Sequence, residues 1–216
     1  MADSRTLAAI LTMTVDTNKL IKKIVKEKFI GQGIKQKGQS RLWYYLVDYY
    51  LILVEFQPSS WDKGSYLNVG VDFLWYPKDF FAFEFGDRLS SFKRFVDEKQ
   101  FETEVEELCD LAISKVNHYK KLFSDKKSVA DKLLKLHRDK SNDWEKFAIG
   151  LSFALAGQNS KAIDYLKKVI GDNYKHDWEF ERSKIAIDYI KAIEKGTFST
   201  FLHDTVDTTK KLLKVS

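Results

Sequence analysis

The chain has 216 residues, 44% of them apolar and 31% charged, with only two prolines. This composition is typical of a protein with a sizeable core and excludes a disordered chain. No apolar run reaches the ~18 to 20 residues of a membrane span, and the single cysteine excludes an internal disulfide, so we expect a cytoplasmic protein without a membrane partner.

The net charge of +5 is unevenly distributed along the chain. Residues 1–41 have a net charge of +6, residues 42–110 of −8, and residues 111–216 of +7. An acidic middle between basic ends is not typical of a uniform nucleic-acid binder. It favours basic helices that pack around an acidic sheet.

The N-terminal segment "TLAAILTMTV" has the apolar length of a signal peptide. Only Arg5 precedes it, and no small-residue cleavage pattern follows, so we expect no signal peptide. From Thr17 to Ile30 the apolar residues fall at helical spacing, which predicts a helix. Gly31 and Gly33 end it, as glycines do just past a helix C-terminus.

Four strands are predicted next. The run "LWYYLVDYYLILVEFQ", Leu42 to Gln57, is too long for one strand, and its polar break at Asp48 predicts a hairpin. After a Pro-Gly-Ser loop, "SYLNVGVDFLWY" is the third strand, and "FFAFEF", Phe80 to Phe85, is the fourth. The short connections predict an antiparallel meander.

The third strand alternates between two kinds of residue. Its apolar face would carry Leu67, Val69, Val71 and Phe73, while Tyr66, Asn68, Gly70 and Asp72 would point to the opposite face. A long amphipathic helix is predicted from about Glu102 to Phe123. We expect Leu108, Ala112 and Val116 of this helix to be buried together with the apolar face of the strand.

The remaining sequence reads as helical, with segments near Ser128–His137, Trp178–Lys195 and Ser199–Lys214. Residues 144–170 resemble a tetratricopeptide helical hairpin, in which small residues let two antiparallel helices approach closely. One and a half such units do not form a stable solenoid, so we expect a helical annex docked on the sheet. The positions that carry the resemblance are Gly150, Phe153, Gly157, Ala162, Leu166 and Val169.

The predicted fold class is therefore α+β: a four-stranded antiparallel sheet packed by helices, with a C-terminal all-helical annex. The first helix and the long helix are expected to cover one face of the sheet. We place the α+β domain at residues 1–125 and the annex at residues 126–216.

Three stretches, "FIGQGIKQKGQSRLWYY", "LVEFQPSSW" and "YLNVGVDF", resemble the bacterial family named domain of unknown function 4304 over residues 17–125. The chain departs from the family pattern at "FAFEFGDR", where members often carry arginine in the fourth strand. The resemblance implies an α+β fold and a bacterial cytoplasmic setting, and it implies no activity. The matching positions are Gly33, Lys35, Lys37, Gly38, Trp43, Gln57, Ser59, Asn68 and Gly70.

The polar face of the third strand is the candidate binding site. Gln57 and Asn68 flank one hairpin and are expected to be near neighbours, with Ser59 and Trp61 above them and Asp72 further along the face. Gly70 would let a ligand or another backbone come close. The alternative is that this row is only the solvated side of a sheet, with Gly70 at a bulge.

The sequence contains few signs of metal-binding or catalytic chemistry. The four histidines, His118, His137, His176 and His203, have no partner at metal-ligand spacing, and Cys109 has the character of a small core residue. Walker, Rossmann and nucleophile-elbow motifs are absent. We therefore expect no catalytic residues, no metal ligands and no cofactor.

Three hypotheses on function follow. The first is a non-catalytic protein-binding module, immunity-like or accessory, whose partner is another protein, since tyrosine and tryptophan are favoured at interfaces. The second is an enzyme or a small-molecule or nucleotide binder that uses the Gln57/Asn68 face. The third is a nucleic-acid-binding protein that uses the basic terminal segments, with bases stacked on exposed aromatic rings.

Overall fold

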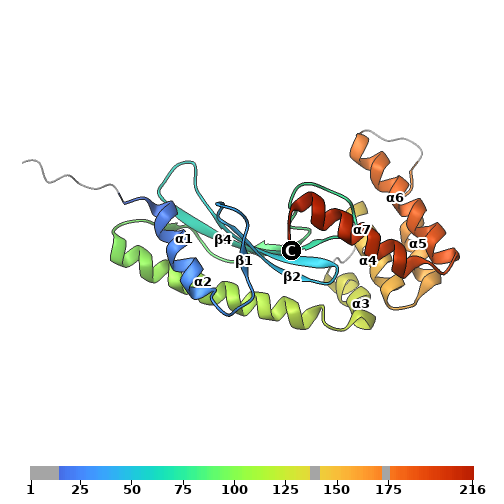
Figure 1. Ribbon diagram of the computed structural model, residues 1–216, viewed down its shortest axis with the longest axis horizontal. Helices are drawn as coiled ribbons and strands as arrows, with labels where there is room; N and C mark the ends of the chain where they lie inside the picture. The colour runs from blue at the N-terminus through green and yellow to red at the C-terminus, as the bar shows by residue number, and fades with distance from the viewer. Residues whose placement is uncertain (1–14, 137–141, 172–175) are drawn as a thin grey trace, which may run out of the picture.

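A computed structural model describes residues 15–136, 142–171 and 176–216 (Figure 1). Most of the apolar N-terminal stretch and His137, at the end of the helix predicted near Ser128–His137, lie outside these residues. The fold is α+β, as predicted. Within the described residues it has seven helices and six strands: α1 Thr17–Lys28, β1 Lys35–Gln36, β2 Leu42–Val47, β3 Tyr50–Gln57, β4 Gly64–Phe73, β5 Phe85–Arg88, β6 Lys93–Arg94, α2 Glu98–Leu122, α3 Lys126–Leu136, α4 Asp143–Leu155, α5 Asn159–Lys167, α6 Asp177–Glu194 and α7 Phe198–Leu213.

The sheet is open and antiparallel, with the order β1-β2-β3-β4-β5, and β6 pairs with the beginning of β4. The predicted count of four strands is wrong, because the two-residue strands β1 and β6 add to the sheet. The predicted strand at Phe80–Phe85 is also wrong. The chain joins the sheet only near its end, where Glu84 N donates to Val71 O at 3.0 Å and β5 begins at Phe85.

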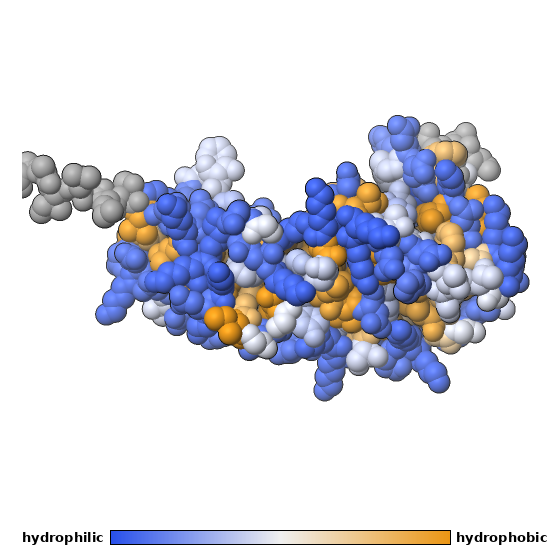
Figure 2. Space-filling model, viewed as in Figure 1, coloured by the Kyte–Doolittle hydropathy of each residue, from blue (hydrophilic) through white to orange (hydrophobic). Residues whose placement is uncertain are grey.

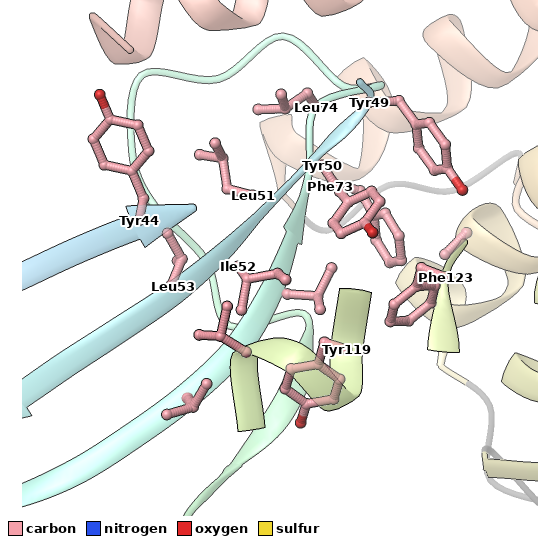
Figure 3. Packing of buried hydrophobic residues seen from close by; sticks show 14 of the residues in the cluster. Tyr44, Tyr49, Tyr50, Leu51, Ile52, Leu53, Phe73, Leu74, Tyr119 and Phe123 are labelled. Atoms are coloured by element: carbon pink, nitrogen blue, oxygen red, sulfur yellow. The ribbon is translucent and has the colours of Figure 1, made fainter. Parts of the chain in front are cut away.

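One face of the sheet packs on α2, and α1 packs on α2 in turn (Figure 1). The predicted register of β4 is confirmed, since Leu67, Val69, Val71 and Phe73 are buried. Leu108, Ala112 and Val116 of α2 are buried as well. In Figure 3, Tyr119 of α2 and Phe123, the residue that follows α2, lie below the strands, on the side of the sheet to which Ile52 points.

The opposite face is covered over only part of its length. Tyr44, Leu51 and Leu53 are buried on this side (Figure 3). The segment after β4 is tied to the C-terminal helices, because Tyr189 Oη donates to Trp75 O at 2.9 Å and Thr209 Oγ1 donates to Tyr76 O at 3.2 Å. The rest of this face, toward the other end of β4, carries half-buried polar side chains.

The C-terminal helices α3 to α7 pack on one another in chain order. The close contact predicted for α4 and α5 is present: Ala162 is buried, and a Cβ on Gly150 would lie 3.0 Å from Leu166 Cγ. Gly157 ends α4 with φ +74°, a backbone conformation that favours glycine. The division into residues 1–125 and 126–216 stays a prediction, and one continuous hydrophobic cluster includes side chains from both parts.

Hydrophilic residues dominate the face seen in Figure 2, and apolar surface gathers mainly where the sheet meets the C-terminal helices. Among the helices of the described residues, none has the length and apolar character needed to cross a membrane.

Candidate functional site

A network of polar side chains lies on the exposed part of the sheet, centred on Asn68 of β4. The register pairs Asn68 with Glu55 of β3, and Gln57 lies diagonally next to it. Asn68 Nδ2 donates to Glu55 Oε2 at 2.8 Å and to Gln57 Oε1 at 2.9 Å. The predicted proximity of Gln57 and Asn68 is therefore present in the structure.

Arg88 of β5 completes this network, because the register places it opposite Asn68. Arg88 Nε donates to Asn68 Oδ1 at 3.3 Å, and Nη2 donates to Gln57 Oε1 at 2.8 Å. The guanidinium carbon lies 4.1 Å from the centre of the Tyr66 ring. These contacts use two of the five N–H donors of the guanidinium, so it keeps donors for a partner.

Ser59 and Trp61 lie in the β3–β4 loop, which projects from the side of the sheet opposite α2 (Figure 1). The Trp61 side chain is 96% exposed. Trp61 N donates to Ser59 Oγ at 3.1 Å. We call Gln57, Ser59, Trp61, Asn68 and Arg88 the recognition surface.

The loop that carries Trp61 is anchored at its C-terminal side. Arg94 Nη2 lies 2.6 Å from Asp62 Oδ2, and Phe95 N donates to Lys63 O at 2.9 Å. Gly64 approaches β6 so closely that a Cβ would lie 2.2 Å from Lys93 O. These contacts fix the segment that follows Trp61 against β6.

Gly70 marks the point where the polar face becomes covered. It pairs with Gly86 of β5, and a Cβ on Gly70 would lie 2.8 Å from Phe83 Cδ1 and 2.9 Å from Phe85 O. The close neighbours that a glycine permits here are thus an aromatic ring and another strand.

Asp72 points to the same face but does not join the network around Asn68. It is fully buried and forms an ion pair with Lys78, whose side chain is only 3% exposed. Lys78 Nζ also donates to Glu84 Oε1, and the Asp72 Oδ2 atom accepts from Ala82 N at 3.1 Å. We call Asp72, Lys78 and Glu84 the buried charge cluster.

Burial dominates the electrostatics of this cluster. Desolvation raises the pKa of Glu84 to about 7; Lys78 opposes this shift and Asp72 adds to it. Desolvation also raises the pKa of Asp72, although Lys78 acts in the opposite direction. The pKa of Lys78 is raised, because its two carboxylate partners outweigh the effect of burial.

Lys78 and Glu84 of this cluster line a cavity of about 550 Å³. Its volume is within the ~300 to 1,000 Å³ of typical small-molecule sites. One wall comes from the segment between β4 and β5, with Phe80 and Phe83. The facing wall comes from the first turns of α4 and α6, with Trp144 and Trp178.

The two tryptophans of this wall are stacked, with ring centres 6.1 Å apart. The guanidinium carbon of Arg182 lies 5.1 Å from the Trp144 ring and 4.9 Å from the Trp178 ring. Arg182 Nη2 donates to Asp143 Oδ2 at 2.9 Å. These contacts join α4 and α6 and hold the aromatic wall in place.

The structure brings Gln57 and Asn68 together as predicted and places Asp72 outside their network. Sequence reasoning missed Arg88, Lys78 and Glu84. Arg88 was missed because β5 begins later than predicted. The sequence offered only a weak signal for the other two, because Lys78, Asp79 and Glu84 all interrupt the aromatic run "YPKDFFAFEF" and Asp79 is exposed. Charged side chains are rarely fully buried unless they are paired, so the sequence alone did not show which of the three is buried.

Cys109 is buried on α2, and desolvation raises the pKa of its thiol to about 12. A thiol with such a pKa is not a thiolate at neutral pH and is a poor nucleophile. In the part of the chain that the structure describes, no three or more His, Cys, Asp or Glu side chains group in a way that would hold a metal ion.

Comparisons with known proteins found no match: no family model matches the sequence, no curated protein matches it, and no solved structure matches the fold. The resemblance to domain of unknown function 4304 stays a hypothesis.

Proposed function

We propose that this chain is a non-catalytic protein-binding module, immunity-like or accessory, and that it binds its partner protein through the recognition surface. The observation that carries this proposal is the 96% exposure of Trp61, in the loop that follows Gln57 of the polar network. Tryptophan and arginine are the residues most enriched among interface hot spots. Leaving an indole in water is unfavourable unless a partner buries it.

The recognition surface is also pre-organised. Asn68, Gln57 and Arg88 already hold one another through hydrogen bonds, and the segment after Trp61 is anchored to β6. A surface that is ordered before binding loses less conformational entropy on association. The partner chemistry that fits is an apolar pocket for the indole, surrounded by acceptors for the guanidinium of Arg88.

The experiment replaces Trp61 with the photo-crosslinker p-benzoylphenylalanine in cells that naturally produce the protein. The matched control carries the same crosslinker at Ile30, which is 74% exposed at the end of α1. We expect a protein crosslinked from position 61 and not from position 30. Equal products from both positions would contradict the proposal.

The captured protein is then purified, and its affinity for the chain is measured. Trp61→Ala and Arg88→Ala should each weaken binding at least tenfold, which is about 1.4 kcal/mol. Ile30→Ala should change the affinity less than twofold. Unchanged binding by Trp61→Ala would overturn the proposal.

A further inference from the structure

The cavity above the buried charge cluster has features that the recognition surface does not use. Its rim exposes three large aromatic side chains, Phe80 at 57%, Phe83 at 39% and Trp178 at 45%. Apolar side chains gathered around a cavity are typical of a site that an occupant covers. The cavity is separated along β4 from Asn68, because Gly70 and the Phe83 ring lie between them.

The charges at the cavity decide which occupant it accepts. Glu84 and Glu145 line the cavity, Asp72 lies behind Lys78, and Lys78 is the single base among the described lining residues. Arg182, behind the Trp144 and Trp178 rings, is paired with Asp143. Lys78 Nζ is held between the carboxylates of Asp72 and Glu84, so it is not available to an anion. Among the three members of the buried charge cluster, Glu84 is the most exposed, at 15% of its side chain.

The helix N-termini at the cavity do not reverse this balance. A helix N-terminus favours anions. However, α4 carries Asp143 and Glu145 in its first turn, and α6 carries Asp177 and Glu179. Asn142 and Glu145 also form a capping box, in which Glu145 N donates to Asn142 Oδ1 and Asn142 N donates to Glu145 Oε2. The protein's own acids therefore already satisfy these positive ends.

We infer that this cavity binds a small organic cation, a protonated amine on a flat apolar or aromatic body, with the amine at Glu84 and the body between Phe83 and Trp178. The ammonium group supplies the positive charge that the acidic cluster lacks. Aromatic faces attract such cations, and the walls bury the apolar body.

Proton release accompanies binding. In the free protein, burial raises the pKa of Glu84 to about 7, so a proton partly balances the cluster near neutral pH. The ligand cation takes the place of that proton. Because the ionised fraction of such a group is about ten times larger at pH 8 than at pH 6, the affinity for an amine rises about tenfold over this interval.

The experiment uses three probes with the same indole body and different head groups: tryptamine, tryptophol and indole-3-propionate. Binding to the full chain is measured by isothermal titration calorimetry at pH 8. We expect tryptamine to bind at least tenfold more tightly than the neutral and anionic probes. No measurable binding of tryptamine at millimolar concentration, or equal or tighter binding of indole-3-propionate, overturns the inference.

Variants of the protein test where the amine binds and which group releases the proton on binding. Glu84→Gln should weaken tryptamine binding at least tenfold, leave tryptophol binding unchanged and abolish the pH dependence. Glu98→Gln, an exposed acid on α2, is the matched control. His176 stacks on Trp178, so His176→Gln tests whether the histidine contributes to the pH dependence. Circular dichroism shows whether each variant is folded, and unchanged tryptamine binding by folded Glu84→Gln overturns the inference.

Discussion

Asn68 and Asp72 lie four residues apart on β4 and point to the same face of the sheet, but one contacts an exposed network and the other is fully buried. The neighbours of Asn68 come from the adjacent strands β3 and β5. The partners of Asp72, Lys78 and the amide of Ala82, come from the segment after β4, which the helices α6 and α7 hold in place. Alternation within a strand therefore predicts which face a side chain takes, and distant segments decide whether that face is covered.

The largest effect is expected when the buried charge cluster is broken. Lys78→Ala leaves two buried carboxylates without their cation, so the free energy of unfolding at pH 8 should fall by about 3 to 5 kcal/mol. The loss should be smaller at pH 5, because Asp72 and Glu84 then take up protons. Urea denaturation measures both values. A loss below about 1 kcal/mol at pH 8 would mean that Lys78 is solvated.

The pH dependence of stability tests the buried charge cluster in a second way, by comparing the wild type with Glu84→Gln. The pKa of Glu84 is raised from 4.5 to about 7 on folding, so the folded state binds its proton more tightly than the unfolded state. Its contribution to stability is complete below pH 4.5 and is lost as the pH rises through about 7. From pH 4.5 to about pH 7, the free energy of unfolding of the wild type should fall by on the order of 3 kcal/mol relative to that of Glu84→Gln. Parallel pH profiles of the two proteins would contradict this prediction.

The substitution Gly70→Ala tests the close contact of β4 with β5, at the position between half-buried Asn68 and fully buried Asp72. The added methyl group of Gly70→Ala would approach Phe85 O to 2.9 Å, and a strand carbonyl cannot move aside as a flexible side chain does. We expect a loss of about 1 to 3 kcal/mol in the free energy of unfolding. Thermal and urea denaturation measure it. An unchanged stability would indicate that β4 and β5 are further apart than described.

The smallest effect on stability is expected in the exposed network. The double change Gln57→Ala plus Asn68→Ala removes half-exposed hydrogen bonds, so the free energy of unfolding should change by about 1 kcal/mol or less. The same variant should bind the captured partner protein at least tenfold more weakly. Unchanged partner binding would leave this network as the solvated side of the sheet.

The sequence was sufficient for the register of β4 and for the hairpin at Asp48, because both depend on local alternation and on a short polar break. It was also sufficient to bring Gln57 and Asn68 together, since they flank one hairpin. It was not sufficient for Asp72, whose cover is tied to Tyr189 and Thr209, more than a hundred residues away.

The segment Phe80–Glu84 shows a second limit of prediction from the sequence, which concerns residue propensity. Its aromatic residues are typical of a strand, yet the chain uses them to line a cavity and to place Glu84 beside Lys78. Propensity alone does not separate these outcomes, because aromatic residues are favoured both in strands and in binding sites.

The most direct test of the account is the titration of the Glu84 carboxyl, followed by NMR of its side-chain carboxyl carbon and assigned with Glu84→Gln. If Glu84 belongs to a buried cluster with an excess of negative charge, its midpoint should lie near pH 7. Tryptamine at saturating concentration should lower that midpoint, because the bound cation stabilises the ionised carboxylate. A midpoint near 4.5, the ordinary value, with no response to tryptamine, would contradict both the buried cluster and the cation site.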